Sequence, residues 1–93
     1  MIEFLIKCDE SEMPYTGEQF EKAIHPSIPH TAAPGKWTID LGNDRFVDFS
    51  SEPPGIQISF DDGIDQQLSE KVANDVVKNF EKLTGRPFYP LWL

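Results

Sequence analysis

Residues 56–87, IQISFDDGIDQQLSEKVANDVVKNFEKLTGRP, decide the fold of this chain because they join its clearest strand pattern to its clearest helix pattern. In residues 56–60, large apolar residues alternate with Gln57 and Ser59, which predicts a strand with one buried face. From 66 to 84, apolar residues recur every three or four positions, which predicts a long amphipathic helix. We therefore expect a sheet whose apolar face is covered by this helix.

Capping residues define both ends of the predicted helix. Asp65 is suited to the N-cap, because its carboxylate accepts a hydrogen bond from the free N–H groups of the first turn. Gly85 suits the left-handed position after the last turn, and Pro87 prevents the helix from continuing. We interpret Asp61-Asp62-Gly63 as the turn before this cap, because a calcium loop would need alternating oxygen ligands and a distal glutamate.

Three further strands are predicted at residues 2–8, 36–41 and 45–49. Short turns rich in Gly, Pro, Asn and Asp separate the last three of the four strands, which favours an antiparallel meander. The tail at 86–93 is extended, and its two prolines restrict it to an edge strand or a packed tail.

A capping box formed by Thr16 and Gln19 predicts a short helix over about residues 17–25. Pro26 ends it, because the residue before a proline avoids the helical region. Residues 25–35 are expected to form a loop. The predicted fold class is α+β: a four-stranded, mainly antiparallel sheet in the order strand, helix, three-strand meander, helix. The tail is a candidate C-terminal edge strand, and the helices pack on one face.

Charge and composition bound the function. The 93 residues form a single domain, 1–93, in which sixteen acidic residues face eight basic ones and give a formal net charge of −8. Such a chain repels phosphate backbones, so we expect no direct nucleic-acid binding, while its field attracts basic partners. The alternative is that the charge serves only solubility. One cysteine, no signal peptide and no run of about 20 apolar residues predict a cytoplasmic protein without membrane contact.

Catalytic and metal-binding patterns are absent from the sequence. Cys8 with His25 or His30 would make a thiol and base pair only if the thiol were exposed, and its strand position predicts burial instead. Two histidines and one cysteine without CxxC or HxxxH spacing make a poor zinc ligand set. We therefore expect a non-enzyme with no cofactor and no metal.

Clustered acids and exposed aromatics are the candidate partner-binding residues. Acidic residues follow the first strand and the fourth strand, and they would share one rim if these strands were parallel neighbours. Aromatic side chains are the types enriched at binding hot spots, although core burial is the alternative for each of them. The candidates are Asp9, Glu10, Glu12, Asp61, Asp62, Asp65, Tyr15, Tyr89 and Trp92.

The long helix ends in Leu83-Thr84-Gly85-Arg86-Pro87 and runs into a short apolar strand. Together with the small acidic chain, this ending resembles the immunity proteins of bacterial polymorphic toxin systems, including contact-dependent growth inhibition. The resemblance covers the C-terminal third and carries no motif, so no residue role transfers from it. It implies a cytoplasmic protein that neutralises one cognate basic toxin domain of nuclease type by blocking its active site or substrate groove.

Two other functions stay open. A non-catalytic accessory subunit, or a phage-encoded protein inhibitor, would bind through the apolar C-terminal tail. A small hydrolase or metal protein would need turnover or tight metal binding. The sequence leaves the oligomeric state open.

Overall fold

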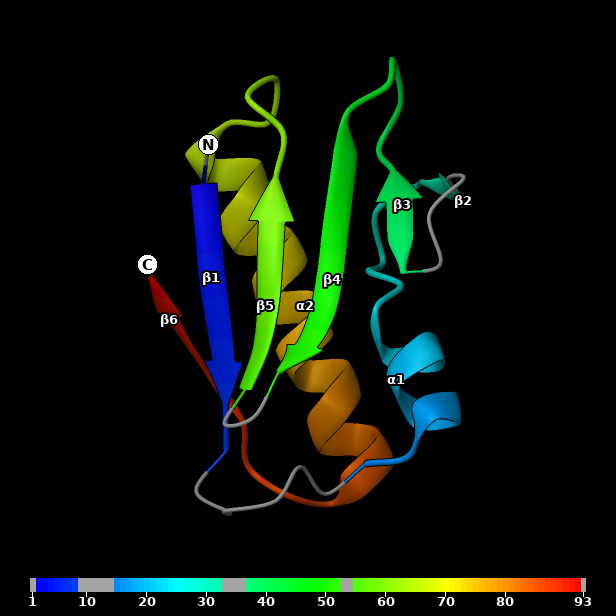
Figure 1. The fold of residues 1–93 in the computed structure, drawn as a ribbon, viewed down its shortest axis with the longest axis vertical. Coiled ribbons are helices and arrows are strands. Elements are labelled where there is room, and N and C mark those ends of the chain that lie inside the picture. The colour runs from blue at the N-terminus through cyan, green and yellow to red at the C-terminus, as the bar shows by residue number, and fades with distance from the viewer. Residues whose placement is uncertain (1, 9–14, 33–36, 53–54, 93) are drawn as a thin grey trace.

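A sheet covered on one face by two helices forms the body of the protein in the computed structural model, which describes residues 2–8, 15–32, 37–52 and 55–92 (Figure 1). The α+β class predicted from the sequence is confirmed. The strands are β1 Ile2–Lys7, β2 Thr31–Ala32, β3 Thr38–Asp40, β4 Phe46–Glu52, β5 Gly55–Phe60 and β6 Tyr89–Trp92, and the helices are α1 Gly17–Ala23 and α2 Gln66–Thr84.

The strands form one antiparallel sheet in the order β2-β3-β4-β5-β1-β6. The predicted meander is confirmed as β3, β4 and β5, and the tail forms the edge strand β6 against β1. Residues 25–35 were expected to be loop throughout, and this is wrong at Thr31–Ala32, which pair with β3. Two residues are too few for a sequence pattern, so only the pairing reveals this strand.

The first and fourth predicted strands, β1 and β5, are neighbours, but they run antiparallel and not parallel. Ile2 lies opposite Phe60 and Lys7 lies opposite Gly55. The chain therefore leaves β1 and β5 at opposite ends of the sheet, as the two arrows in Figure 1 show. The condition for a shared acidic rim, parallel neighbouring strands, is therefore not met. Strand order depends on long-range pairing, which local patterns do not encode.

The helix termini match the capping chemistry of the sequence. Asp65 caps α2 by accepting a hydrogen bond from Leu68 N at 2.8 Å, and Gly85 ends it in the left-handed region at φ 71°. Thr16 and Gln19 form both bonds of the capping box at α1. The helix then ends two residues earlier than predicted.

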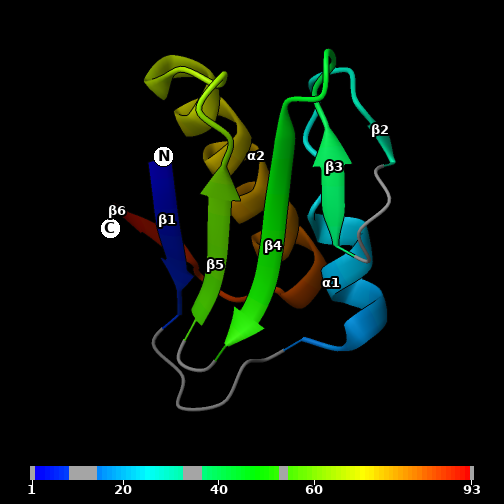
Figure 2. The same cartoon turned by 45° about the horizontal axis from the view of Figure 1, so that its top comes forward.

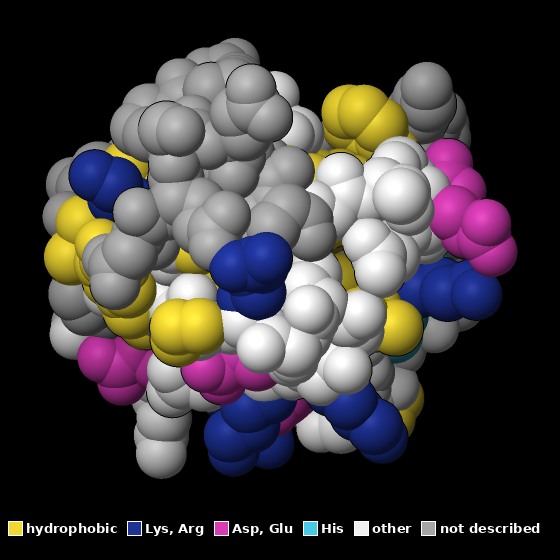
Figure 3. Space-filling view, turned by 90° about the horizontal axis from the view of Figure 1, so that it is seen from below, with side chains coloured by type: hydrophobic (Ala, Val, Ile, Leu, Met, Phe, Trp, Pro, Cys, Tyr) yellow, Lys and Arg dark blue, Asp and Glu magenta, His cyan; other side chains and the backbone are white. Residues whose placement is uncertain are grey.

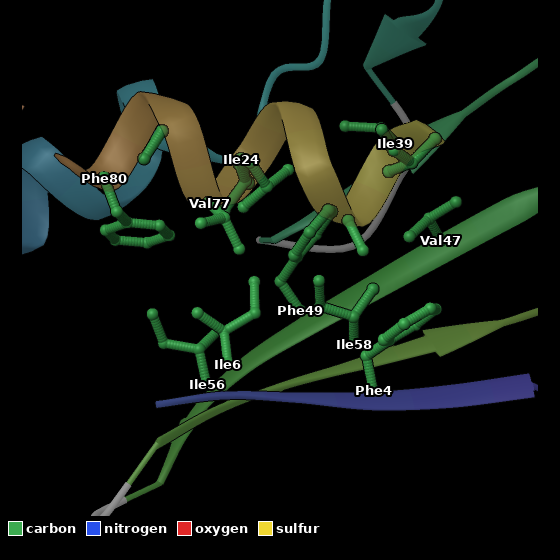
Figure 4. Close-up of a cluster of buried hydrophobic side chains, with 14 of the residues drawn as sticks. Phe4, Ile6, Ile24, Ile39, Val47, Phe49, Ile56, Ile58, Val77 and Phe80 are labelled. Atoms are coloured by element: carbon green, nitrogen blue, oxygen red, sulfur yellow. The ribbon is translucent and has the colours of Figure 1, made fainter. Parts of the chain in front are cut away.

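The core lies between α2 and the sheet, where the labelled side chains of Figure 4 meet. Val72, Val76 and Phe80 of α2 are fully buried. Burying a side chain of this kind stabilises the folded state by about 1.5–3 kcal/mol. Cys8 is buried as predicted, with 4% of its surface exposed. Leu83, placed on the same stripe by its spacing, is 37% exposed.

Candidate functional site

Five aspartates lie on the segments at the end of the sheet where β5 leads into α2 and β3 turns into β4. Figure 2 shows these two connections at the same end of the sheet. Two hydrogen bonds join these segments: Phe46 N donates to Asp61 Oδ2 at 2.8 Å, and Asp61 N donates to Phe46 O at 3.1 Å. We call this surface the upper acidic edge, and it comprises Asp40, Asp44, Asp61, Asp62 and Asp65.

The β3–β4 turn presents Asp44 to solvent. Asn43 and Asp44 both adopt the left-handed region, at φ 56° and 58°, which Asn and Asp tolerate better than other residues with a β-carbon. Asp40 Oδ1 accepts a hydrogen bond from Gly42 N at 2.7 Å and so tightens the turn. The side chain of Asp44 is left exposed at the tip.

Arg45 is the cation of the β3–β4 turn. Its Nε donates to Gly42 O and its Nη2 donates to Leu41 O, both at 3.0 Å. The guanidinium therefore braces the backbone of its own turn. Five aspartates and one arginine leave these segments with an excess of negative charge, in a chain whose net charge is −8.

Three of the six predicted acidic residues lie at the upper acidic edge. Asp62 and Asp65 are exposed at the upper acidic edge, and Asp61 is partly buried there. The other three predicted acids, Asp9, Glu10 and Glu12, lie outside the described residues. Sequence reasoning overlooked Asp40 and Asp44, although the Gly-Asn-Asp turn signal that brings them to this edge was readable in the sequence.

The predicted aromatic residues lie elsewhere. Tyr15 is half-buried, with its ring 5.7 Å from Phe20 and 5.3 Å from Phe80, and its hydroxyl hydrogen bonds with Ser51. Burial raises the pKa of Tyr15 above its usual value, although the bond to Ser51 partly opposes this. Tyr15 therefore packs against the core. Tyr89 is 39% exposed on β6, and the side chain of Trp92 lies outside the described part of the structure.

A second polar region joins the loop after α1 to α2, and we call it the loop clasp. Asp75 Oδ2 accepts hydrogen bonds from Ser27 N at 3.2 Å and Ser27 Oγ at 2.7 Å, while Lys71 Nζ donates to Asp75 Oδ1 at 3.1 Å. Burial acts to raise the pKa of Asp75, but these bonds and the Lys71 charge outweigh it and hold the pKa below its usual value. Asn79 Nδ2 donates to Ala23 O and to the backbone oxygen of His25.

The two histidines belong to the same clasp. His30 Nδ1 donates to Ile28 O at 2.7 Å, so its Nε2 is free to accept the 2.9 Å bond from His25 Nδ1. The rings are 17° from parallel with centroids 5.1 Å apart, which fits rings bonded edge to edge. Burial, and then the neighbouring His30, lower the pKa of His25. His25 thus bonds with His30 and not with the buried Cys8.

Neither metal chemistry nor a membrane span is indicated in the part of the chain that the structure describes. No three His, Cys, Asp or Glu side chains among residues 2–8, 15–32, 37–52 and 55–92 form a group that could hold a metal ion. Within the same ranges, neither helix is both long and apolar enough to cross a membrane. The end opposite the upper acidic edge shows Lys and Arg side chains with Asp and Glu beside several of them (Figure 3).

Comparison with family models, curated proteins and solved structures returned no match for this chain.

Proposed function

We propose that this protein binds and neutralises a basic protein partner, in the manner of a toxin-immunity protein. The observation that carries the proposal is the upper acidic edge, where five aspartates lie on neighbouring segments and Arg45 is bonded to the backbone of its own turn. Such a surface speeds the encounter with a positively charged groove and repels other acidic proteins. Neighbouring aspartates can also occupy the positions in a nuclease groove at which the phosphates of the substrate bind.

The test uses a variant that removes charge without disturbing the fold. Asp44→Asn, Asp62→Asn and Asp65→Asn combined keep the shape of each side chain, and Asn serves almost as well as Asp at the N-cap of α2. Tagged wild type and variant are expressed in the producing organism, and the retained protein is identified by mass spectrometry. That protein is then expressed alone and with each form.

We expect wild type to retain a basic toxin domain and to protect cells from it. The variant should associate about ten-fold or more slowly, and wild-type binding should weaken between low and high salt, because exposed charges are screened. A partner without a basic surface, or equal and salt-independent binding by both forms, contradicts the proposal.

One observation favours the second candidate, a subunit that binds through its apolar tail. Tyr89 and Leu91 are 39% and 42% exposed on β6. Because β6 pairs with β1, removing the tail would strip a strand from the sheet, so point substitutions are the better probe. If this candidate holds, Tyr89→Ser with Leu91→Ser should abolish binding, and wild-type binding should be the same at low and high salt.

A further inference from the structure

The face of the sheet turned away from α1 and α2 is not covered by either helix, and we call it the open face (Figure 1). Its side chains follow from the two-residue alternation of strands. In β1, Phe4 and Ile6 are buried toward the helices, so Glu3, Leu5 and Lys7 point to the open face. Residues directly opposite on neighbouring strands share a face, so the pairing register identifies the rest.

One row of the open face is polar and acidic. Glu3 lies opposite Ser59, Ser59 opposite Asp48, and Asp48 opposite Thr38, so the row crosses four strands. Thr38 Oγ1 donates to Asp48 Oδ1 at 2.6 Å, and Ser59 Oγ donates to Glu3 Oε1 at 3.4 Å. We call these four residues the carboxylate row. The hydroxyl groups orient its two carboxylates in advance of binding.

One corner of the same face is apolar. Leu91 lies opposite Leu5, and Tyr89 lies opposite Lys7. A Cβ atom on Gly55 would stand 2.8 Å from Leu5 Cδ1, so the leucine lies directly on bare backbone. We call Leu5, Tyr89 and Leu91 the apolar corner, and two of them are the most exposed large hydrophobic residues described. The tail therefore shares one face with Glu3 and Asp48, two acidic residues that are far from it in the sequence.

The charges and the edge of the sheet together select the occupant. The described charges on this face are Glu3, Asp40 and Asp48 against Lys7, which favours a basic partner and opposes a second copy of this chain. A strand added beside the apolar corner would need the outer edge of β6. Pro90 in its middle lacks a backbone N–H and occurs in edge strands with that position outward, so this edge cannot offer a full ladder. A helix is the element that normally covers a sheet face.

We propose that the open face binds an amphipathic helix of the basic partner. Apolar residues of that helix lie on the apolar corner, and its Lys or Arg residues meet the carboxylate row. From β6 to β4 the face spans three strand spacings, about 14 Å, which about ten residues of helix would cross. This inference rests on the proposed function and adds the docking face and the kind of element that it receives.

The test uses a 14-residue helical peptide of leucine and lysine as the probe, and the same peptide with alanine in place of leucine as its control. The full chain, labelled with ¹⁵N, is titrated with each, and amide shifts are mapped. Leu91→Ser and Asp48→Asn alter the open face. Leu83→Ser is the matched control, because Leu83 is 37% exposed on the helical side against 42% for Leu91.

We expect the leucine peptide to shift the amides of Leu5, Asp48, Gln57 and Leu91. Leu91→Ser should weaken binding about five-fold or more, as expected for a lost apolar contact, while Leu83→Ser leaves it unchanged. Equal loss in Leu83→Ser, or shifts confined to α2, overturns the inference. If both peptides shift only residues 42–44 and 61–65, the inference fails and the proposed function stands. If neither peptide shifts any amide, the inference fails, and the proposed function is decided by its own binding test.

Discussion

The upper acidic edge and the loop clasp are both built from polar side chains that bond to backbone groups, but they differ in how far their carboxylates are exposed to solvent. In the loop clasp, Asp75 and Asn79 are turned inward and bond to the backbone of another segment. At the upper acidic edge, Asp44, Asp62 and Asp65 are exposed. The difference teaches that aspartates with the same charge act differently in different places. A buried carboxylate must be hydrogen bonded within the protein and so stabilises the fold, whereas a solvent-exposed carboxylate on a turn can also contact a partner.

The prediction with the largest expected effect tests this comparison with two substitutions that each remove one carboxylate. Asp75→Ala should lower the free energy of unfolding by about 2–3 kcal/mol, because Ser27 and Lys71 lose a buried shared acceptor. Asp44→Asn should change it by less than about 0.5 kcal/mol, because the side chain is exposed. Urea unfolding followed by circular dichroism measures both. Equal losses would show that the two regions do not differ in this way.

A smaller effect separates two asparagines of α2. Asn79→Ala should cost about 1–2 kcal/mol, since Ala23 O and His25 O lose their donor and the better helix propensity of alanine offsets only part of this. Asn74→Ala, at an exposed position of the same helix, should stabilise by a few tenths of a kcal/mol. The same unfolding assay decides between them. A stabilising Asn79→Ala would contradict the assigned role of the clasp.

The smallest effect is a pH dependence confined to the clasp. The pKa of His25 is lowered from 6.5 in the folded protein, so the unfolded chain binds more protons and stability rises with pH in this range. The contribution is complete above pH 6.5 and is lost as the pH falls below it. Because the ring is exposed and screened by water, we expect less than about 1 kcal/mol between pH 7.5 and 5.5.

His25→Gln is the control for this pH dependence, because its amide can still donate to His30 while it does not titrate. The general effect of reducing the net charge is common to both forms and cancels in their difference. Wild type and His25→Gln with the same pH slope would contradict the prediction.

The sequence by itself determined the elements whose bonds are local. The bounds of α2 follow from its repeat of three and four residues, from Asp65 three positions before the N–H that it caps, and from the need for Gly85 at positive φ. The capping box of α1 and the alternation in β5 are equally local. The positions of Asp62 and Asp65 beside the turn after β5 were readable for the same reason.

Only the tertiary structure decided which segments lie side by side. Whether β1 runs parallel or antiparallel to β5 makes no difference to either strand pattern, yet it places the ends of these strands at opposite ends of the sheet. Likewise, Leu91 and Asp48 lie on the same face of the sheet only because β6, β1, β5 and β4 pair in that order. The entropic cost of closing a loop grows only slowly with its length, so the number of residues between two strands does not decide which strands pair. The burial of one shared apolar face against α2 decides this.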